Sequence, residues 1–226
     1  MHIGLIGGIG PAATVFYYER IVQAFAASMQ PLHLTIAHTS ILELSRNVTA
    51  GLVDMQASEY NRVTGQLAAA GADVVAITSM GGHFCAKEFA ALSPLPMISG
   101  PDSVADHLKL QGIRRVGILG TRVVMQTCLY GALSELEAVA PVGDDLSQVN
   151  DDYVTMAIAG TASPAQRERL LNAGHRLVHD QGADVVLLGG TDLNLAYDGA
   201  TLDFPVIDSA MVHADAIVSA ALVRSR

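Results

Sequence analysis

The chain has 226 residues, of which 50% are hydrophobic, and its mean hydropathy of +0.36 predicts a globular protein with one large core or two smaller ones. Lys and Arg number 13 against 22 Asp and Glu, and the net charge of -9 repels phosphate backbones and anionic lipid. Nucleic acid and membrane surfaces are therefore excluded as partners, and no apolar run reaches the roughly 18 residues that a membrane span needs.

Short runs of Val, Ile and Leu alternate with longer amphipathic stretches, which is typical of strands buried on both faces and of crossover helices. The first run, Ile3 to Gly10, has no basic leader, so we expect a strand and turn rather than a signal peptide, and a cytoplasmic location. The pattern predicts an α/β fold with mainly parallel sheets. In chain order we expect strands at 3–6, 34–37, 74–77, 116–119, 185–188 and 206–207, and helices at 12–27, 58–70, 124–137, 164–181 and 210–223.

The sequence repeats itself. The segment from Ile3 to Gly8 aligns with the segment from Val116 to Thr121, and the pentapeptide Gly-Ala-Asp-Val-Val occurs at 71–75 and again at 182–186. Both matches lie at nearly the same offset within their halves. We therefore expect two pseudo-symmetric lobes, each with a parallel sheet flanked by helices.

The expected first lobe covers 1–100, with 208–226 returning to it, and the expected second lobe covers 101–207. Ligands of parallel sheets bind beyond the carboxyl ends of the strands. We therefore expect the loops that follow the strands to converge on one cleft between the lobes. The loops concerned are 7–13, 78–83, 121–123 and 189–193.

The turn after the first strand, Gly8 to Ala13, formally matches a relaxed dinucleotide-binding fingerprint. That fingerprint needs an acidic residue near the end of the second strand to hold a ribose, and residues 36–40 contain none. The backbone amides of Gly8, Ile9 and Gly10 are better suited to hold a carboxylate, because a helix N-terminus favours any anion. No cofactor is expected.

At this point a family resemblance becomes specific. The segment from Ile3 to Thr14 closely resembles the opening of aspartate/glutamate racemases. Residues 71–83 and 182–193 resemble the two active-site strands and loops of that family, and 204–209 with His213 is similar to its C-terminal strand and helix. The resemblance implies a homodimer that uses neither pyridoxal phosphate nor metal. It also implies a site in which two thiols exchange a proton at the α-carbon of a small carboxylate or amino acid.

The chain departs from this pattern at the two thiols. Where the family has a cysteine in Cys-Asn-Thr-x-His, residues 79–83 read Ser-Met-Gly-Gly-His, and where it has Gly-Cys-Thr-Glu, residues 189–192 read Gly-Gly-Thr-Asp. The internal repeat independently pairs Ser79 with Gly190. A thiol can be tuned to take a proton near neutrality, whereas an unassisted serine is too weak a base and glycine offers none. The two-thiol mechanism cannot operate here.

Three other residues are candidates for the missing chemistry. His83 is placed to activate Ser79 for proton relay, or else it is a hydrogen-bonding residue at a helix N-terminus. Asp192 is either a proton acceptor or the cap of the turn after its strand. Thr191 is expected to bind substrate through its hydroxyl and N–H.

The remaining predicted site residues concern the shape of the pocket and its charge. Three glycines lack side chains and are expected to widen the pocket for a substrate larger than aspartate, namely Gly81, Gly82 and Gly190. Met80 and Thr121, in loops after strands, complete the predicted substrate-binding set. Arg46 is either a clamp for a distal carboxylate or an ordinary loop arginine.

Neither the cysteines nor the histidines indicate a metal. Cys85 and Cys128 lie far apart and are expected to be buried free thiols. The eight histidines show no metal-ligand spacing above background.

Three functions follow. The first is a cofactor-independent racemase-like enzyme with an atypical site. The second is a cofactor-free isomerase or decarboxylase that stabilises an enediolate with backbone donors and needs protonation from one side only. The third is a non-catalytic protein that keeps the carboxylate cradle. Exchange of the α-proton with solvent deuterium distinguishes the third from the first two.

Overall fold

A computed structural model describes residues 1–223, which divide into two compact units. Unit 1 comprises Met1–Ser103 together with the segment from Ala210 onward, and unit 2 comprises Val104–Ser209. Each unit contains one parallel sheet flanked by helices, so the α/β fold expected from the sequence is confirmed. Among the described helices, none combines the length and the apolar character that a bilayer crossing requires.

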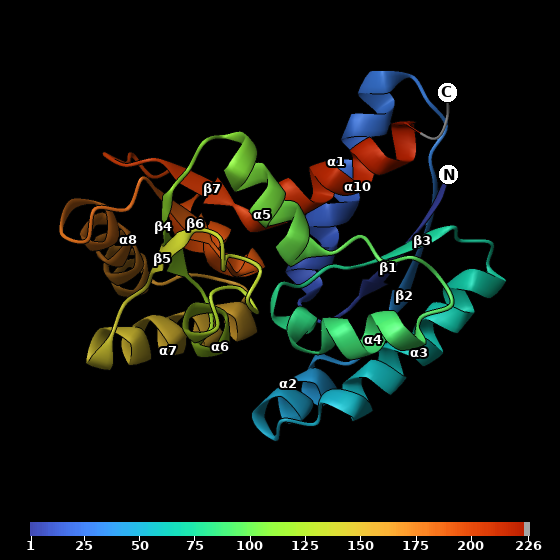
Figure 1. The fold of residues 1–226 in the computed structure, drawn as a ribbon, viewed down its shortest axis with the longest axis horizontal. Helices are drawn as coiled ribbons and strands as arrows, with labels where there is room; N and C mark the ends of the chain where they lie inside the picture. Colours follow the sequence, from blue (N-terminus) through green and yellow to red (C-terminus); the bar gives the residue numbers. More distant parts are fainter. Residues whose placement is uncertain (224–226) are drawn as a thin grey trace. The chain divides into compact units, whose positions relative to one another are not determined.

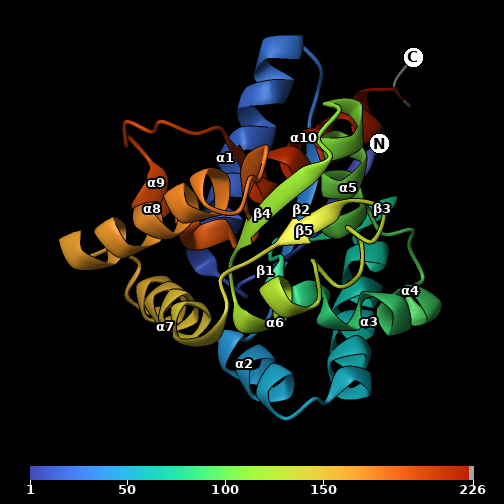
Figure 2. The same ribbon diagram turned by 60° about the vertical axis from the view of Figure 1, so that its left-hand side comes forward.

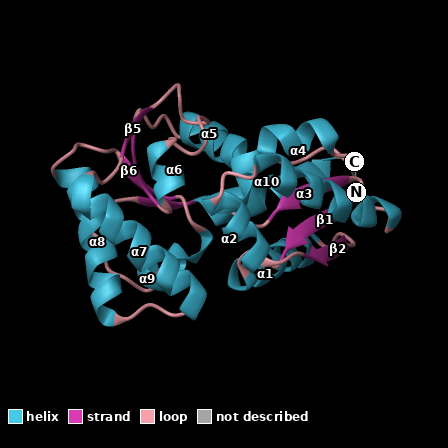
Figure 3. Ribbon diagram, turned by 90° about the horizontal axis from the view of Figure 1, so that it is seen from below, coloured by secondary structure: helices cyan, strands magenta, loops and turns pink. Residues whose placement is uncertain are grey.

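The sheet of unit 1 has the strand order β2-β1-β3, with β1 at its centre. One face packs on α1 and α10 through Leu5, and the other packs on α3 and α4 through Ile6 and Ile77. Figures 1 and 3 show these helices on the two sides of the sheet. The elements of this unit are β1 (His2–Gly7), α1 (Pro11–Ser28), β2 (His33–His38), α2 (Ile41–Thr49), α3 (Val53–Ala69), β3 (Val74–Ile77), a 3₁₀ turn η1 (Gly81–Cys85), α4 (Ala86–Leu92) and α10 (Ser209–Val223).

The sheet of unit 2 has the order β5-β4-β6-β7, and all its strands are parallel. Helix α8 begins with a capping box between Ser163 and Gln166, and it packs on the sheet where Gly117 leaves room for Leu177. Figure 2 shows β4 and β5 side by side. The elements are α5 (Gly100–Leu110), which begins in unit 1, then β4 (Arg115–Leu119), α6 (Arg122–Gln126), β5 (Glu137–Val139), α7 (Gly143–Ala159), α8 (Pro164–His179), β6 (Val185–Leu188), a 3₁₀ turn η2 (Thr191–Leu193), α9 (Asn194–Tyr197) and β7 (Val206–Asp208).

The repeated pentapeptide has the same structural task in each unit. The Asp73 carboxylate accepts a hydrogen bond of 2.7 Å from the amide of His2, at the start of β1. The Asp184 carboxylate likewise accepts one of 2.8 Å from the amide of Arg115, at the start of β4. Each aspartate thus joins the central strand of its sheet to the strand beside it. The order β2-β1-β3 accordingly recurs as β5-β4-β6.

The prediction of a helix at 124–137 is wrong beyond Gln126. Helix α6 ends at Gln126, and the backbone then turns because Cys128, Leu129 and Tyr130 have φ angles of 50°, 56° and 58°. The chain continues into the short edge strand β5, which pairs with β4 from Glu137 onward. Residues 127–136 form turns and a bend, and of the expected helix only Glu137 belongs to the sheet. Helices α2, α4, α5, α7 and α9 lie outside the expected ranges.

Candidate active site

The loop between β1 and α1 has a backbone that only glycine adopts easily. Gly8 and Gly10 have φ angles of 86° and 119°, and a Cβ atom on Gly8 would lie 2.4 Å from the carbonyl oxygen of Thr39. The Gly8 amide donates a 3.0 Å hydrogen bond to the hydroxyl of Thr14 in the first turn of α1. That hydroxyl also lies 3.0 Å from the hydroxyl of Thr78, after β3. Thr14, which the sequence interpretation overlooked, therefore fixes the loop to the ends of both strands.

Within the described residues, the amides of Ile9 and Gly10 have no hydrogen-bond acceptor. Both lie at the N-terminus of α1, a helix of 18 residues, where the helix dipole favours a negative charge. The Ile9 side chain is buried in the core of unit 1 and anchors the loop. Of the three amides expected to hold a carboxylate, the one of Gly8 is thus already bonded.

We expect Thr14→Val to lower the free energy of unfolding by about 1–3 kcal/mol, because the Gly8 amide loses its acceptor in a half-buried place. The same change should weaken the binding of small carboxylates, since the loop that presents the Ile9 and Gly10 amides is released. Urea unfolding and calorimetric titration would measure the two effects. Thr49→Val, at an exposed position on α2, is the control and should change neither quantity.

The loop after β3 uses its amides internally. The Gly82 amide donates to the carbonyl and to the hydroxyl of Ser79, at 3.2 and 3.3 Å, and the His83 amide donates 3.1 Å to the Met80 carbonyl. The amides of Gly82 and His83 are therefore already bonded within the loop. Ser79 itself is 8% exposed, with its hydroxyl at the start of η1.

His83 does not reach the Ser79 hydroxyl. Its Nδ1 lies 2.8 Å from the Ser79 carbonyl oxygen, which can only accept, so Nδ1 carries the proton. Its Nε2 accepts a 3.1 Å hydrogen bond from the Gly100 amide. Burial lowers the pKa of His83 to about 4, so the ring is neutral near pH 7. With both nitrogens bonded to backbone, His83 positions the Ser79 loop rather than activating the serine, which corrects the expectation of a proton relay.

A second buried histidine packs edge-on against the first. The ring of His213, from α10, lies 5.7 Å from that of His83 between centroids. Its Nε2 donates 2.9 Å to the Ile98 carbonyl and its Nδ1 accepts 2.9 Å from the Tyr17 hydroxyl. Burial, together with the nearby His83, lowers its pKa to about 3. Unit 1 thus holds two neutral, fully bonded imidazoles behind the Ser79 loop.

The expectation that glycines widen the pocket is wrong for Gly82. A Cβ atom there would lie 2.7 Å from the Tyr60 hydroxyl and 3.0 Å from Ile77, so the glycine allows close packing. Gly81 does have room, since the nearest atom to a Cβ would be the Ser79 hydroxyl at 3.8 Å. Met80, expected to bind substrate, is fully buried, and its side chain packs against Gly100.

In unit 2 the space beside Gly190 is occupied by Tyr153. The backbone of Gly190 is extended, with φ of -137°, so other residues could adopt it. A Cβ atom there would nevertheless lie 2.4 Å from Cε2 and 2.8 Å from the hydroxyl of Tyr153, which extends from α7. The glycine therefore does not widen a pocket. The Tyr153 phenol occupies the place in which a side chain at 190 would begin.

Tyr153 joins the loop residues Thr191 and Asp192 in one buried cluster. The tyrosine hydroxyl and the Thr191 hydroxyl each donate a 3.4 Å hydrogen bond to Oδ2 of Asp192. All three residues are less than 9% exposed. Burial raises the pKa of Asp192 above its ordinary range, and the two donors partly oppose that rise. Burial and the Asp192 charge raise the pKa of Tyr153, which stays protonated.

No sequence motif pointed to Tyr153. Its helix was not expected, and an isolated tyrosine in a polar segment resembles any surface residue. One indication was available, however, because a glycine that replaces a functional side chain leaves space that another residue must fill. That inference predicts that some residue fills the space beside Gly190, but it does not identify the residue.

The other predicted residues lie as follows. Thr121 caps α6, with its hydroxyl accepting a 3.4 Å hydrogen bond from the Val124 amide. Arg46 is exposed on α2 and forms no ion pair with a described residue. Cys85 is a buried free thiol whose pKa burial raises to about 12, which makes it unreactive at neutral pH. Cys128 is free but half-buried, so the expectation that it is fully buried is wrong.

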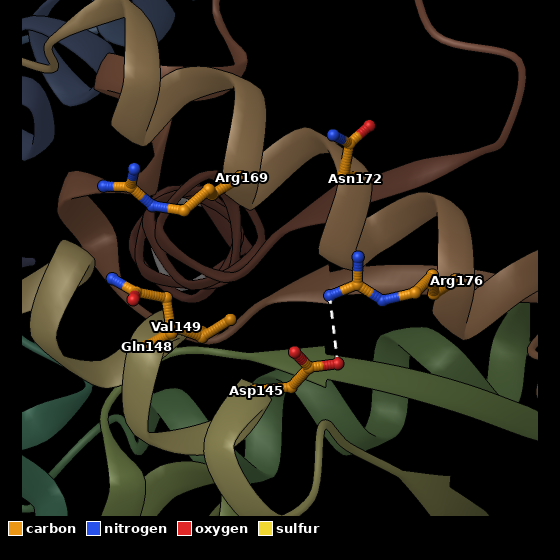
Figure 4. Close-up of a pocket in the computed structure, with 6 residues that line it drawn as sticks. All are labelled: Asp145, Gln148, Val149, Arg169, Asn172 and Arg176. Carbon is orange, nitrogen blue, oxygen red and sulfur yellow. Dashed lines mark ion pairs between the residues drawn. The ribbon is translucent and has the colours of Figure 1, made fainter.

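A polar cavity lies between α7 and α8 in unit 2 (Figure 4). It contains none of the predicted site residues. Of its two arginines, Arg176 pairs with Asp145 at 3.1 Å and Arg169 pairs with Asp152 at 2.6 Å. Because both cations are already neutralised by carboxylates, the cavity is poorly suited to bind a carboxylate substrate. Its lining residues are Asp145, Gln148, Val149, Arg169, Asn172 and Arg176.

Comparisons with known proteins agree with one another. A family model described as Asp/Glu/Hydantoin racemase matches residues 6–217. A solved candidate Asp/Glu racemase from Yersinia pestis is 29% identical, with a TM-score of 0.87 over 98% of this chain and 100% of that one. An aspartate racemase homologue from Pyrococcus horikoshii is 24% identical, with a TM-score of 0.81 over 98% and 99% of the two chains. A glutamate racemase from Francisella tularensis, solved with D-glutamate, is 13% identical, with a TM-score of 0.66 over 99% and 82%. The last two likenesses show the fold alone.

Proposed function

Because this chain belongs to the Asp/Glu/hydantoin racemase family, we propose that it is a racemase-like isomerase acting by proton transfer at the α-carbon of a small carboxylate or amino acid. The proposal includes independence from pyridoxal phosphate and metal, a homodimeric assembly and a cytoplasmic location. The observation that carries it is the buried Tyr153–Asp192 pair beside Gly190, because this pair supplies acid/base groups next to the position that lacks a thiol.

Asp192 is the proposed base. Burial raises its pKa, which makes the carboxylate a stronger proton acceptor than an exposed aspartate. Tyr153 is the proposed hydrogen-bond donor, because its raised pKa keeps the phenol protonated. The amides of Ile9 and Gly10 are proposed to bind the substrate carboxylate, with Thr191 contributing a hydroxyl.

Ser79 is the substrate contact proposed for unit 1, but no basic side chain among the described residues bonds its hydroxyl. The nearest imidazole, His83, bonds the Ser79 carbonyl and not its hydroxyl. Racemisation requires a competent base on each face of the carbon, whereas an enediolate-forming isomerase or decarboxylase needs only one. Asp192 is a much stronger proton acceptor than Ser79. This difference favours, as a second candidate, a reaction that needs one base and acts on the same class of substrate.

Proton exchange in D₂O would distinguish these functions. Exchange of the α-proton with inversion supports two-base racemisation, exchange with retention supports the one-base reaction, and the absence of exchange across small amino and hydroxy acids contradicts both. Proton NMR would follow the exchange and chiral chromatography the configuration.

We expect Asp192→Asn to slow this exchange by about 10² to 10⁴-fold, because a positioned base typically contributes that much. Tyr153→Phe should slow it less, since the carboxylate remains. Asp180→Asn and Tyr18→Phe alter the same residue types at other positions and should leave the rate unchanged. An unchanged rate in Asp192→Asn would refute the assignment of the base.

A further inference from the structure

Three potential metal ligands that have no part in the proposed proton transfer lie together on unit 2. His175 and His179 stand one turn apart near the C-terminus of α8, and Asp203 belongs to the loop before β7. Oδ2 of Asp203 lies 3.2 Å from Nδ1 of His175 and 3.3 Å from Nε2 of His179. The three ligand atoms all lie within 4.8 Å of one another.

Packing beneath the cluster holds the aspartate beside the helix. Phe204, which follows Asp203, is 8% exposed and presses on α8 at Gly174, where a Cβ atom would lie 2.8 Å from its ring. Gly174 directly precedes His175, and the rings of His175 and Phe204 meet edge to face at 6.5 Å. The loop is thus anchored by a buried aromatic residue at the point where it meets the first histidine.

The spacing suits a tetrahedral ion. Metal–ligand bonds of about 2.0–2.1 Å place neighbouring ligand atoms of a tetrahedron about 3.3 Å apart. The two N···O distances of 3.2 and 3.3 Å match this value. Two imidazoles and one carboxylate favour zinc and similar transition metals, whereas Mg²⁺ and Ca²⁺ prefer oxygen alone. A water molecule would complete the coordination.

We propose that His175, His179 and Asp203 form a binding site for a zinc-class divalent cation. Asp203 precedes β7 and therefore lies at the amino end of the parallel sheet, whereas Gly190 to Asp192 follow the carboxyl end of β6. The metal is accordingly not part of the proposed proton transfer. It joins the end of α8 to the loop before β7 and stabilises unit 2.

The experiment uses tag-free protein treated with chelator and then dialysed, so that no engineered histidines compete. Calorimetric titration with Zn²⁺ should show one equivalent bound per chain, and thermal unfolding should shift to higher temperature as Zn²⁺ saturates the site. Co²⁺ should give the intense visible absorption of tetrahedral coordination. Mg²⁺ and Ca²⁺ should do neither.

His179→Gln and Asp203→Asn should each abolish the bound equivalent and the thermal shift, while His33→Gln, at an exposed histidine of unit 1, should leave both intact. These variants are expected to fold, since the residues are exposed. Failure of the intact protein to bind Zn²⁺ would overturn the proposal, and so would equal binding by His179→Gln. Either result leaves the proton-exchange assay, and hence the proposed function, unaffected.

Discussion

The protein as it stands is expected to racemise aspartate and glutamate several orders of magnitude more slowly than the triple variant Ser79→Cys, Gly190→Cys, Tyr153→Leu. Positioned acid/base groups contribute about 10² to 10⁴-fold each. Within residues 1–223, no basic side chain bonds the Ser79 hydroxyl, and Gly190 has no side chain. Among the described residues, the acid/base groups beside position 190 are those of the Tyr153–Asp192 pair.

Restoring the thiols requires a third change. In Ser79→Cys with Gly190→Cys, the new side chain at 190 meets the Tyr153 ring, and such overpacking costs about 1–3 kcal/mol of unfolding free energy. Tyr153→Leu removes the ring atoms that interfere while still filling the core. We therefore expect the triple variant to gain racemase activity and the double variant to remain nearly inactive and less stable.

Chiral chromatography of D-aspartate and D-glutamate would measure the gain, and thermal unfolding would show that each variant folds. Gly65→Cys is the steric control, because a Cβ atom there meets nothing within 4 Å. Brisk turnover by the unmodified protein would show that the assignment of positions 79 and 190 is wrong. A stable, active double variant would show that Tyr153 moves easily.

Acid is expected to destabilise the protein well before its carboxylates titrate. The ordinary pKa of histidine is 6.5, but burial lowers it to about 4 for His83 and to about 3 for His213. Between pH 6.5 and these values the unfolded chain binds protons that the folded chain does not, so stability is complete above pH 6.5 and declines as the pH falls. At pH 5 the loss is about 2 kcal/mol per histidine, or about 4 kcal/mol for the pair.

Urea unfolding at pH 7, 6 and 5 would measure this decline. His83→Gln should reduce the pH dependence by about half, because only His213 then remains a buried base, whereas His33→Gln should not change it. The raised pKa of Asp192 acts in the opposite direction, since the folded state then takes up a proton first. A stability that is constant from pH 7 to pH 5 would contradict the neutral, fully bonded imidazoles described above.

The fold could be predicted from the sequence where a pattern of residues is compatible with one local structure only. Buried strands such as Val74–Ile77 and Val185–Leu188 coincide with the expected ranges, because continuous apolar runs bounded by glycine fit parallel sheets. The aspartate of the repeated pentapeptide likewise makes the same contact in both sheets, in which its carboxylate accepts a hydrogen bond from the first amide of the central strand. By contrast, 124–137 looked helical but is mostly turns, and the positive φ angles at Cys128, Leu129 and Tyr130 that end the helix are not contained in its hydrophobic periodicity.

The site was harder to predict than the fold. Ser79, Gly190 and Asp192 could be selected because the repeat and the family resemblance fix their positions. Their partners could not be selected, because Tyr153 and His213 come from distant helices and are brought into place by packing alone. For the same reason His83 looked like an activator of Ser79, and only its two backbone hydrogen bonds show otherwise.

The return of α10 to unit 1 has a consequence for the order in which the chain acquires structure during synthesis. Unit 2 is continuous, from Val104 to Ser209, but unit 1 needs Ala210, Ala214 and Ile217 to cover the face of its sheet that carries Leu5. Domains usually fold from the N-terminus onward as they leave the ribosome. Here unit 2 is fully synthesised before unit 1 is complete. The apolar face of the unit 1 sheet that carries Leu5 stays uncovered until the last helix, α10, has been translated.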